Sequence, residues 1–185
     1  MKRIFIALNV LPGAILLKSA STLKTLLAAG SIKWTDIANT HLTLAFLGDT
    51  EEKRIKIVSR MLSDKCAGFG EFSFVLAGMG VFKNFRDPRI IWVGIRSSEQ
   101  LSRLGETVNS GLAEFGFKVE DRPFKPHLTL GRIRSINNVA NLKEVIEMYS
   151  ETEFQNVAVN EIILYESILM QTGPVYKVLG KYSLL

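Results

Sequence analysis

One tetrapeptide occurs twice in this sequence, as His41-Leu42-Thr43-Leu44 and as His127-Leu128-Thr129-Leu130, and the two copies hold both histidines of the chain. Side chains alternate between the two faces of a β-strand. Each copy therefore places its histidine and threonine on one face and its two leucines on the other. The leucines can anchor each strand in a hydrophobic core. If the strands face each other, two imidazoles and two hydroxyls surround one point.

The segments around the two copies follow the same order of strand, helix, motif strand and helix, and the copies are 86 residues apart. We expect strands over 2–9, 40–47, 71–82, 89–96, 117–121, 127–133, 153–159, 161–169 and 174–183. We expect helices over 12–29 with Gly30 as the C-cap, over 51–64 with Thr50 as the N-cap, over 98–115 ended by Gly116, and near 138–149.

An internal duplication of this length is too long for a solenoid repeat and predicts two similar lobes. We therefore expect an α+β fold of two pseudo-symmetric lobes, each an antiparallel sheet with outer helices, around a central cleft. No linker or low-complexity segment divides the chain. The whole of residues 1–185 is expected to form one bilobal domain with interleaved halves.

Composition sets limits on the function. Hydrophobic residues make up 47% of the chain, enough for a packed core, and a net charge of +5 weakly favours an anionic partner such as nucleic acid. Cys66 is the only cysteine, which fits a reducing compartment, and we interpret it as structural. One cysteine and two histidines argue against a zinc site of the usual kind, so no metal is expected.

The N-terminal region resembles a secretion signal, because Lys2 and Arg3 precede an apolar run. Asn9, Pro12 and Gly13 interrupt that run, and residues 2–9 also fit a strand. We favour a mature cytoplasmic start. No apolar stretch is long enough to span a membrane.

The paired motif favours phosphodiester chemistry. Imidazoles titrate near neutral pH, so one can act as general base while the other, protonated, acts as general acid. Threonine hydroxyls can donate hydrogen bonds to the non-bridging oxygens of a phosphate. In-line displacement needs acid and base on opposite sides of the phosphorus, which two facing lobes supply. Neither a metal nor a cofactor is required. A single histidine flanked by leucines would more simply be a core residue, and it is the pair that favours catalysis.

The double motif resembles the two-histidine phosphoesterase superfamily, and within it the RNA 2′,3′-cyclic phosphodiesterase family, historically called 2′-5′ RNA ligase. The resemblance covers nearly the whole chain. It includes the segments 3–7, 41–49, 88–94, 123–132, 164–167 and 173–176.

This resemblance implies a bilobal fold around a water-filled cleft, and opening of a 2′,3′-cyclic phosphate at an RNA 3′ end to leave a 2′-phosphate. It implies that His41 is the proton donor to the departing 3′ oxygen and that His127 is the proton acceptor that activates water. Thr43 and Thr129 would hold the phosphate oxygens. The partner would be RNA with 2′,3′-cyclic phosphate ends, and we expect a monomer.

Other residues are weaker candidates. Arg132 could bind the phosphate, but strict alternation puts it on the face of Leu128 and Leu130 unless a bulge follows Gly131. Lys125 and Arg122 could contact the RNA backbone, but we favour a solvated loop as the explanation for each. A base could stack on one of three aromatic side chains, Trp34, Phe46 or Trp92. For Phe46 and Trp92, which lie inside apolar strands, we favour core packing.

Two alternative functions stay open. The first is ATP-independent 2′-5′ RNA ligation, which is the same chemistry in reverse. The second is a non-catalytic module that binds RNA or a nucleotide in the cleft and does not consume it.

Overall fold

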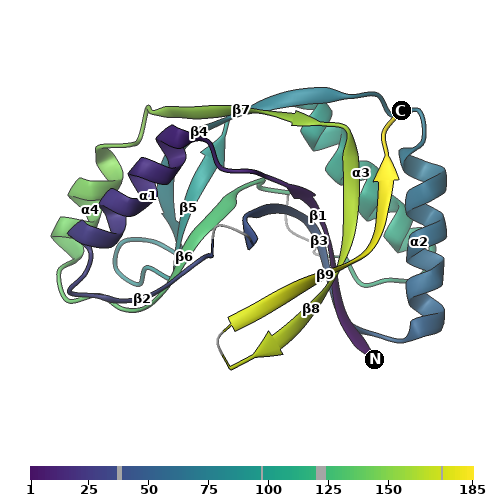
Figure 1. Ribbon diagram of the computed structural model, residues 1–185, viewed down its shortest axis with the longest axis horizontal. Helices are drawn as coiled ribbons and strands as arrows, with labels where there is room; N and C mark the ends of the chain where they lie inside the picture. The colour runs from purple at the N-terminus through teal and green to yellow at the C-terminus, as the bar shows by residue number, and fades with distance from the viewer. Residues whose placement is uncertain (37–38, 97, 120–123, 172) are drawn as a thin grey trace.

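The computed structural model describes residues 1–36, 39–96, 98–119, 124–171 and 173–185. This part of the chain forms four α-helices and nine β-strands (Figure 1). In chain order they are β1 (Lys2–Asn9), α1 (Ala14–Leu26), β2 (Ser31–Trp34), β3 (His41–Thr50), α2 (Glu52–Cys66), β4 (Phe72–Phe82), β5 (Ile90–Ile95), α3 (Glu99–Glu114), β6 (Leu128–Ser135), α4 (Val139–Glu147), β7 (Glu153–Val159), β8 (Glu161–Met170) and β9 (Gly173–Ser183).

The strands pair in the order β7-β4-β5-β6-β3-β1-β8-β9, with β2 added to β6. Every pairing is antiparallel. The predicted α+β fold with antiparallel strands is therefore confirmed. The described strands form one continuous series of neighbours. Between β3 and β6 the pairing consists of a single registered residue pair, Leu42–Leu128.

The helices cover the sheet at its two ends. Figure 1 shows α1 and α4 at one end of the molecule and α2 and α3 at the other, with the strands between them. The centre of the core is β1, whose five consecutive residues Ile4 to Leu8 are buried. The motif leucines are also buried, as the alternation predicts: Leu42 and Leu128 are fully enclosed, and Leu44 and Leu130 nearly so. The two motif strands are thus anchored by their apolar faces.

Two predicted helix caps are wrong. The first helix ends at Leu26 with Leu27 as its C-cap, so Gly30 lies three residues beyond the cap. Thr50 is the last residue of β3, and its hydroxyl donates a hydrogen bond to the carbonyl of Gly48. Glu51 occupies the N-cap of α2 and makes no side-chain cap there. Gly116, in contrast, follows α3 with a positive φ of 68°, as a residue that ends a helix should.

Two short segments also differ from the prediction. Residues 31–34 form β2, which the sequence did not indicate because four residues are too few to show a period. Residues 117–119 do not form a strand, and the rest of the strand predicted over 117–121 lies outside the described residues. Among the described residues, no helix has the length and apolar character needed to cross a membrane.

Candidate active site

A cleft of about 500 Å³ opens beside the junction of the two motif strands. Both motif histidines and both motif threonines line it, together with Arg132. The other lining residues come from β2, from the segment that follows it, and from β3, β5 and the start of β9: Lys33, Trp34, Thr35, Asp36, Asn39, Phe46, Ile90, Gly173, Pro174, Val175 and Tyr176. The structure therefore brings all five predicted site residues to one cavity.

The strand register explains how the two motifs meet. Leu42 of β3 is paired with Leu128 of β6 in antiparallel register. When that register is continued by one residue in each direction, His41 lies across from Thr129 and Thr43 lies across from His127. Directly opposite residues in an antiparallel pair have Cβ atoms roughly 5 Å apart, and diagonal neighbours roughly 7–8 Å apart. The two histidines form such a diagonal, with a threonine at each of the other corners.

Both imidazoles are held in the same orientation. The Nδ1 atom of His41 lies 2.6 Å from the carbonyl oxygen of Asn39, and Nδ1 of His127 lies 2.8 Å from the carbonyl oxygen of Lys125. A carbonyl only accepts hydrogen bonds, so each Nδ1 carries the proton and donates it. In the neutral ring the remaining nitrogen, Nε2, then has a free lone pair. Each ring can therefore accept or donate a proton at Nε2.

Aromatic rings pack around His41. The ring centroid of Phe5 lies 4.9 Å from that of His41, and the ring centroid of Tyr176 lies 5.1 Å from it with the two rings perpendicular. Burial lowers the pKa of His41 below its ordinary value of 6.5. The hydrogen bond to the Asn39 carbonyl opposes that shift, whereas the charges of Arg132 and His127 lower the pKa further. The ring of Phe82 packs against His127, with the two centroids 4.7 Å apart and the rings nearly perpendicular.

Arg132 reaches the cleft because β6 contains a bulge. Thr129 pairs with Trp92 and Gly131 pairs with Ile91, so Leu130 is an extra residue in β6. The bulge reverses the alternation and turns Arg132 to the same face as Thr129. The alternation rule alone had placed Arg132 on the leucine face. The prediction allowed for a bulge after Gly131. The bulge does occur, but it lies at Leu130, one residue before Gly131.

The first motif strand has the same bulge, which corrects the prediction for Phe46. Thr43 pairs with Ala7 and Ala45 pairs with Ile6, so Leu44 is the extra residue in β3. Leu44 and Leu130 occupy the same place in the two tetrapeptides. Beyond this bulge Phe46 faces the cleft and is 49% exposed, so its assignment to the core is wrong. Its ring lies under the guanidinium of Arg3 at 5.0 Å.

The other two aromatic candidates, Trp34 and Trp92, differ in whether they line the cleft. Trp34 lines the cleft from β2. Trp92 is not among the lining residues. Its ring packs 5.2 Å from that of Phe82, and its indole nitrogen is buried with no hydrogen-bond partner among the described residues. Trp92 is half-buried and is not part of the hydrophobic core cluster, so neither base stacking nor the core packing that we favoured is confirmed for it.

Some of the remaining residues were missed, and others have no assigned role. Tyr176 and Lys33 line the cleft, yet neither was singled out, because β2 was not predicted and β9 is remote in sequence. Burial raises the pKa of Tyr176, so its phenol stays neutral near neutral pH. Lys125 is exposed and contributes its backbone carbonyl to His127. Arg122 lies outside the described residues.

Within the described ranges, no three His, Cys, Asp or Glu side chains are grouped so that they could hold a metal ion.

Comparison with known proteins agrees with this geometry. The model of the 2′-5′ RNA ligase superfamily matches residues 32–168, which contain both motifs. The chain belongs to this superfamily. An RNA 2′,3′-cyclic phosphodiesterase of Archaeoglobus fulgidus is 33% identical over 175 residues, which cover 95% of this chain and 96% of that protein. An RNA 2′,3′-cyclic phosphodiesterase of Thermotoga maritima is 36% identical, over 79% of this chain and 76% of that one.

The superfamily fold is also found among solved structures. The crystal structure of a Thermus thermophilus protein superposes with a TM-score of 0.80 at 27% identity. The superposition covers 98% of this chain and 97% of that chain. The family resemblance read from the double motif is thus confirmed over nearly the whole chain.

Proposed function

We propose that this member of the 2′-5′ RNA ligase superfamily is an RNA 2′,3′-cyclic phosphodiesterase. It opens the cyclic phosphate at an RNA 3′ end and leaves a 2′-phosphate and a free 3′ hydroxyl. The observation that carries the proposal is the placement of His41 and His127 on one cleft with both Nδ1 atoms engaged by carbonyls. The named activity of the curated relatives supports the same substrate.

The two histidines divide the proton transfers. His127, neutral at Nε2, takes a proton from the attacking water as the oxygen–phosphorus bond forms. His41, protonated at Nε2, gives its proton to the 3′ oxygen as the bond from phosphorus to that oxygen breaks. The diagonal placement of the rings supports a base and an acid on either side of one phosphorus. The two imidazoles supply both transfers, so the proposed reaction needs no metal ion or cofactor.

The threonines and Arg132 hold the phosphate. Each hydroxyl stands across the strands from one imidazole, where it can donate a hydrogen bond to a non-bridging oxygen. Arg132, turned into the cleft by the Leu130 bulge, brings a positive charge to the same group. These donors stabilise the negative charge that grows on the phosphate oxygens in the transition state.

The same proposal describes the architecture as one bilobal domain with an internal duplication. Four strands lie on each side of the β3–β6 junction along the pairing path, and both motif strands carry the equivalent bulge. Two lobes related in this way supply one histidine and one threonine each. A monomer suffices for activity, because a single chain brings both histidines to the cleft.

Phosphorus NMR of the reaction products tests the function. The purified protein is incubated with a dinucleotide that ends in a 2′,3′-cyclic phosphate, and the 2′-phosphate is expected to accumulate. A 3′-phosphate or an unchanged cyclic phosphate would contradict the proposal. Adding an oligonucleotide with a 5′ hydroxyl separates hydrolysis from ligation, because joined product would favour the reverse reaction.

A further inference from the structure

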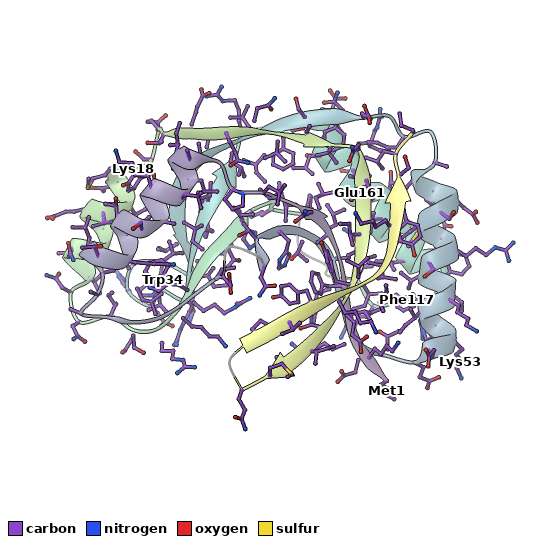
Figure 2. All side chains as sticks on the ribbon, in the orientation of Figure 1. Met1, Lys18, Trp34, Lys53, Phe117 and Glu161 are labelled. Carbon is purple, nitrogen blue, oxygen red and sulfur yellow. The ribbon has the colours of Figure 1, made fainter. Side chains whose placement is uncertain are left out.

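One end of the β8–β9 hairpin projects from the molecule. Figure 1 shows the joined ends of β8 and β9 extending beyond the rest of the sheet. The side chains of Leu169, Met170 and Val175, near this end, are each at least half exposed. Figure 2 labels Glu161 at the start of β8, which is the opposite end of that strand. Because these side chains bury little surface in the core, the position of the projecting end depends on its other contacts.

One of those contacts joins the hairpin to the residue that orients His41. The side-chain amide of Asn39 donates a hydrogen bond of 3.1 Å to the carbonyl oxygen of Pro174, on β9. The backbone carbonyl of the same Asn39 accepts the Nδ1 proton of His41. Asn39 therefore connects the hairpin to the imidazole through two hydrogen bonds, one from its side chain and one to its backbone.

A second contact comes from Tyr176, two residues further along β9. Side chains alternate between the faces of a strand, so Pro174 and Tyr176 share one face, and both line the cleft. The ring of Tyr176 is perpendicular to that of His41 and also packs edge-on against Phe5, with the centroids 4.9 Å apart. Phe5 in turn packs against His41. The hairpin thus contacts the imidazole directly as well as through Asn39.

The second motif orients its histidine through the local backbone. In both motifs, Nδ1 bonds to the carbonyl of the residue two positions earlier. In the second copy the intervening residue is Pro126, whose ring fixes its own φ and restricts the residue before it. In the first copy it is Thr40, which has no such ring and whose carbonyl accepts a hydrogen bond of 3.3 Å from the amide of Val10. The segment before His41 is therefore held by distant parts of the chain, among them the bond from Asn39 to β9.

We propose that Asn39 and Tyr176 are positioning residues that together hold the imidazole of His41 for proton transfer at Nε2. Asn39 fixes the carbonyl that receives the Nδ1 proton, and the ring of Tyr176 limits rotation of the imidazole about its side-chain bonds. The β8–β9 hairpin is the frame on which both contacts depend. The catalytic consequence rests on the proposed function, in which His41 protonates the departing 3′ oxygen. Loss of either contact lowers kcat and changes KM little, because both residues act through His41.

NMR of the two imidazoles tests the role of Asn39. In protein labelled with ¹⁵N in its histidine rings, the nitrogen shifts show which nitrogen carries the proton, and both neutral wild-type rings are expected to carry it at Nδ1 alone. In Asn39→Ala, His41 should show a mixture of the Nδ1–H and Nε2–H forms, while His127 keeps its single form and serves as an internal control. Asn137→Ala is the matched control, because the Asn137 amide also bonds to a distant carbonyl, that of Ala29, and neither residue lines the cleft.

Variants of Tyr176 separate the role of its ring from that of its hydroxyl. Tyr176→Leu removes the aromatic contact that helps to bury His41, so the pKa of His41 in the ¹⁵N titration should rise toward 6.5, whereas Tyr176→Phe should leave it unchanged. The charges of Arg132 and His127 on β6 also lower this pKa, and both groups are intact in these variants. Tyr182→Leu is the matched control, because Tyr182 lies near the other end of β9 and does not line the cleft.

Steady-state kinetics with a cyclic-ended dinucleotide measures the consequence for catalysis. Asn39→Ala and Tyr176→Leu should each lower kcat about 10–100-fold with little change in KM, since a small misplacement of a catalytic group costs on this scale. Tyr176→Phe and the two control variants should retain kcat. Thermal melting of each variant checks the fold.

The outcomes that overturn the proposal are specific. A single Nδ1–H form of His41 in Asn39→Ala, or an equal change at His127, would show that Asn39 does not orient His41. Equal loss of kcat in Tyr176→Phe and Tyr176→Leu would assign the role to the hydroxyl and not to the ring. The NMR measurements need no substrate. If the wild type hydrolyses no cyclic phosphate, the proposed function fails and the catalytic consequence fails with it, while the NMR data still decide what orients His41.

Discussion

Leu42 and Leu128 are paired across β3 and β6, and this pair sets the positions of the two histidines and two threonines of the candidate site. Both side chains are fully buried, and the histidine and threonine on either side of each leucine point to the cleft. The hydrophobic core thus fixes the spacing of the two histidines and the two threonines. A substitution at either leucine of this pair is expected to change both the stability of the protein and its kcat.

The first prediction concerns Leu42→Ala. Removing this buried side chain should destabilise the protein by about 2–5 kcal/mol and also lower kcat, because it loosens the junction between the two motif strands. Leu23→Ala is the matched control, since Leu23 is equally buried but lies on α1. Urea unfolding and steady-state kinetics measure the two effects. Equal kcat values for the two variants at equal destabilisation would show that the junction does not position the site.

The second prediction concerns the threonine hydroxyls. Thr43→Val and Thr129→Val keep the shape of the side chain and remove its donor, so each should lower kcat about 100-fold with little change in stability. The serine variants should recover most of the activity because they restore the hydroxyl. Full activity in either valine variant would remove that threonine from the phosphate site.

The third prediction uses Arg132 to test the acid–base assignment. The positive charge of Arg132 lowers the pKa of His41, so Arg132→Gln should raise that pKa. If His41 is the proton donor, the alkaline limb of the kcat/KM profile follows its pKa and moves to higher pH. The same variant should lower kcat/KM about 10–100-fold through the lost phosphate contact. Arg132→Lys keeps the charge and should leave the limb in place. A shift of the acid limb in Arg132→Gln would mean that His41 is the base.

The fourth prediction is the pH dependence of stability. The pKa of His41 is lowered in the folded protein, so the unfolded chain binds more protons between that pKa and the ordinary value of 6.5. The contribution of His41 to stability is therefore complete above about pH 6.5 and falls as the pH drops below it. In urea unfolding, His41→Asn should show a weaker loss of stability on acidification than the wild type. An identical slope would mean that burial of His41 has no such effect.

Much of the fold was predictable from the sequence because the signals are regular. The alternation in each tetrapeptide correctly predicts buried leucines, and the repeat of the motif correctly predicts that both copies line one cleft. The errors at Arg132 and Phe46 have one physical cause. A bulge adds a single residue to a strand without changing its composition, so an alternation rule continues past Leu44 and Leu130 with the wrong parity. Trp34 was named as a stacking candidate, but its place beside Gly131 depends on β2, which is too short to predict.

The account rests on the claim that His41 and His127 act on one phosphorus. The most direct measurement is single-turnover hydrolysis of a cyclic-ended dinucleotide by His41→Asn, by His127→Asn and by the double variant, with circular dichroism to confirm that each folds. Paired acid–base catalysis predicts a loss of about 10²–10⁴-fold in each single variant, and a double variant much less impaired than the product of the two losses. Near-normal turnover in either single variant would contradict the claim.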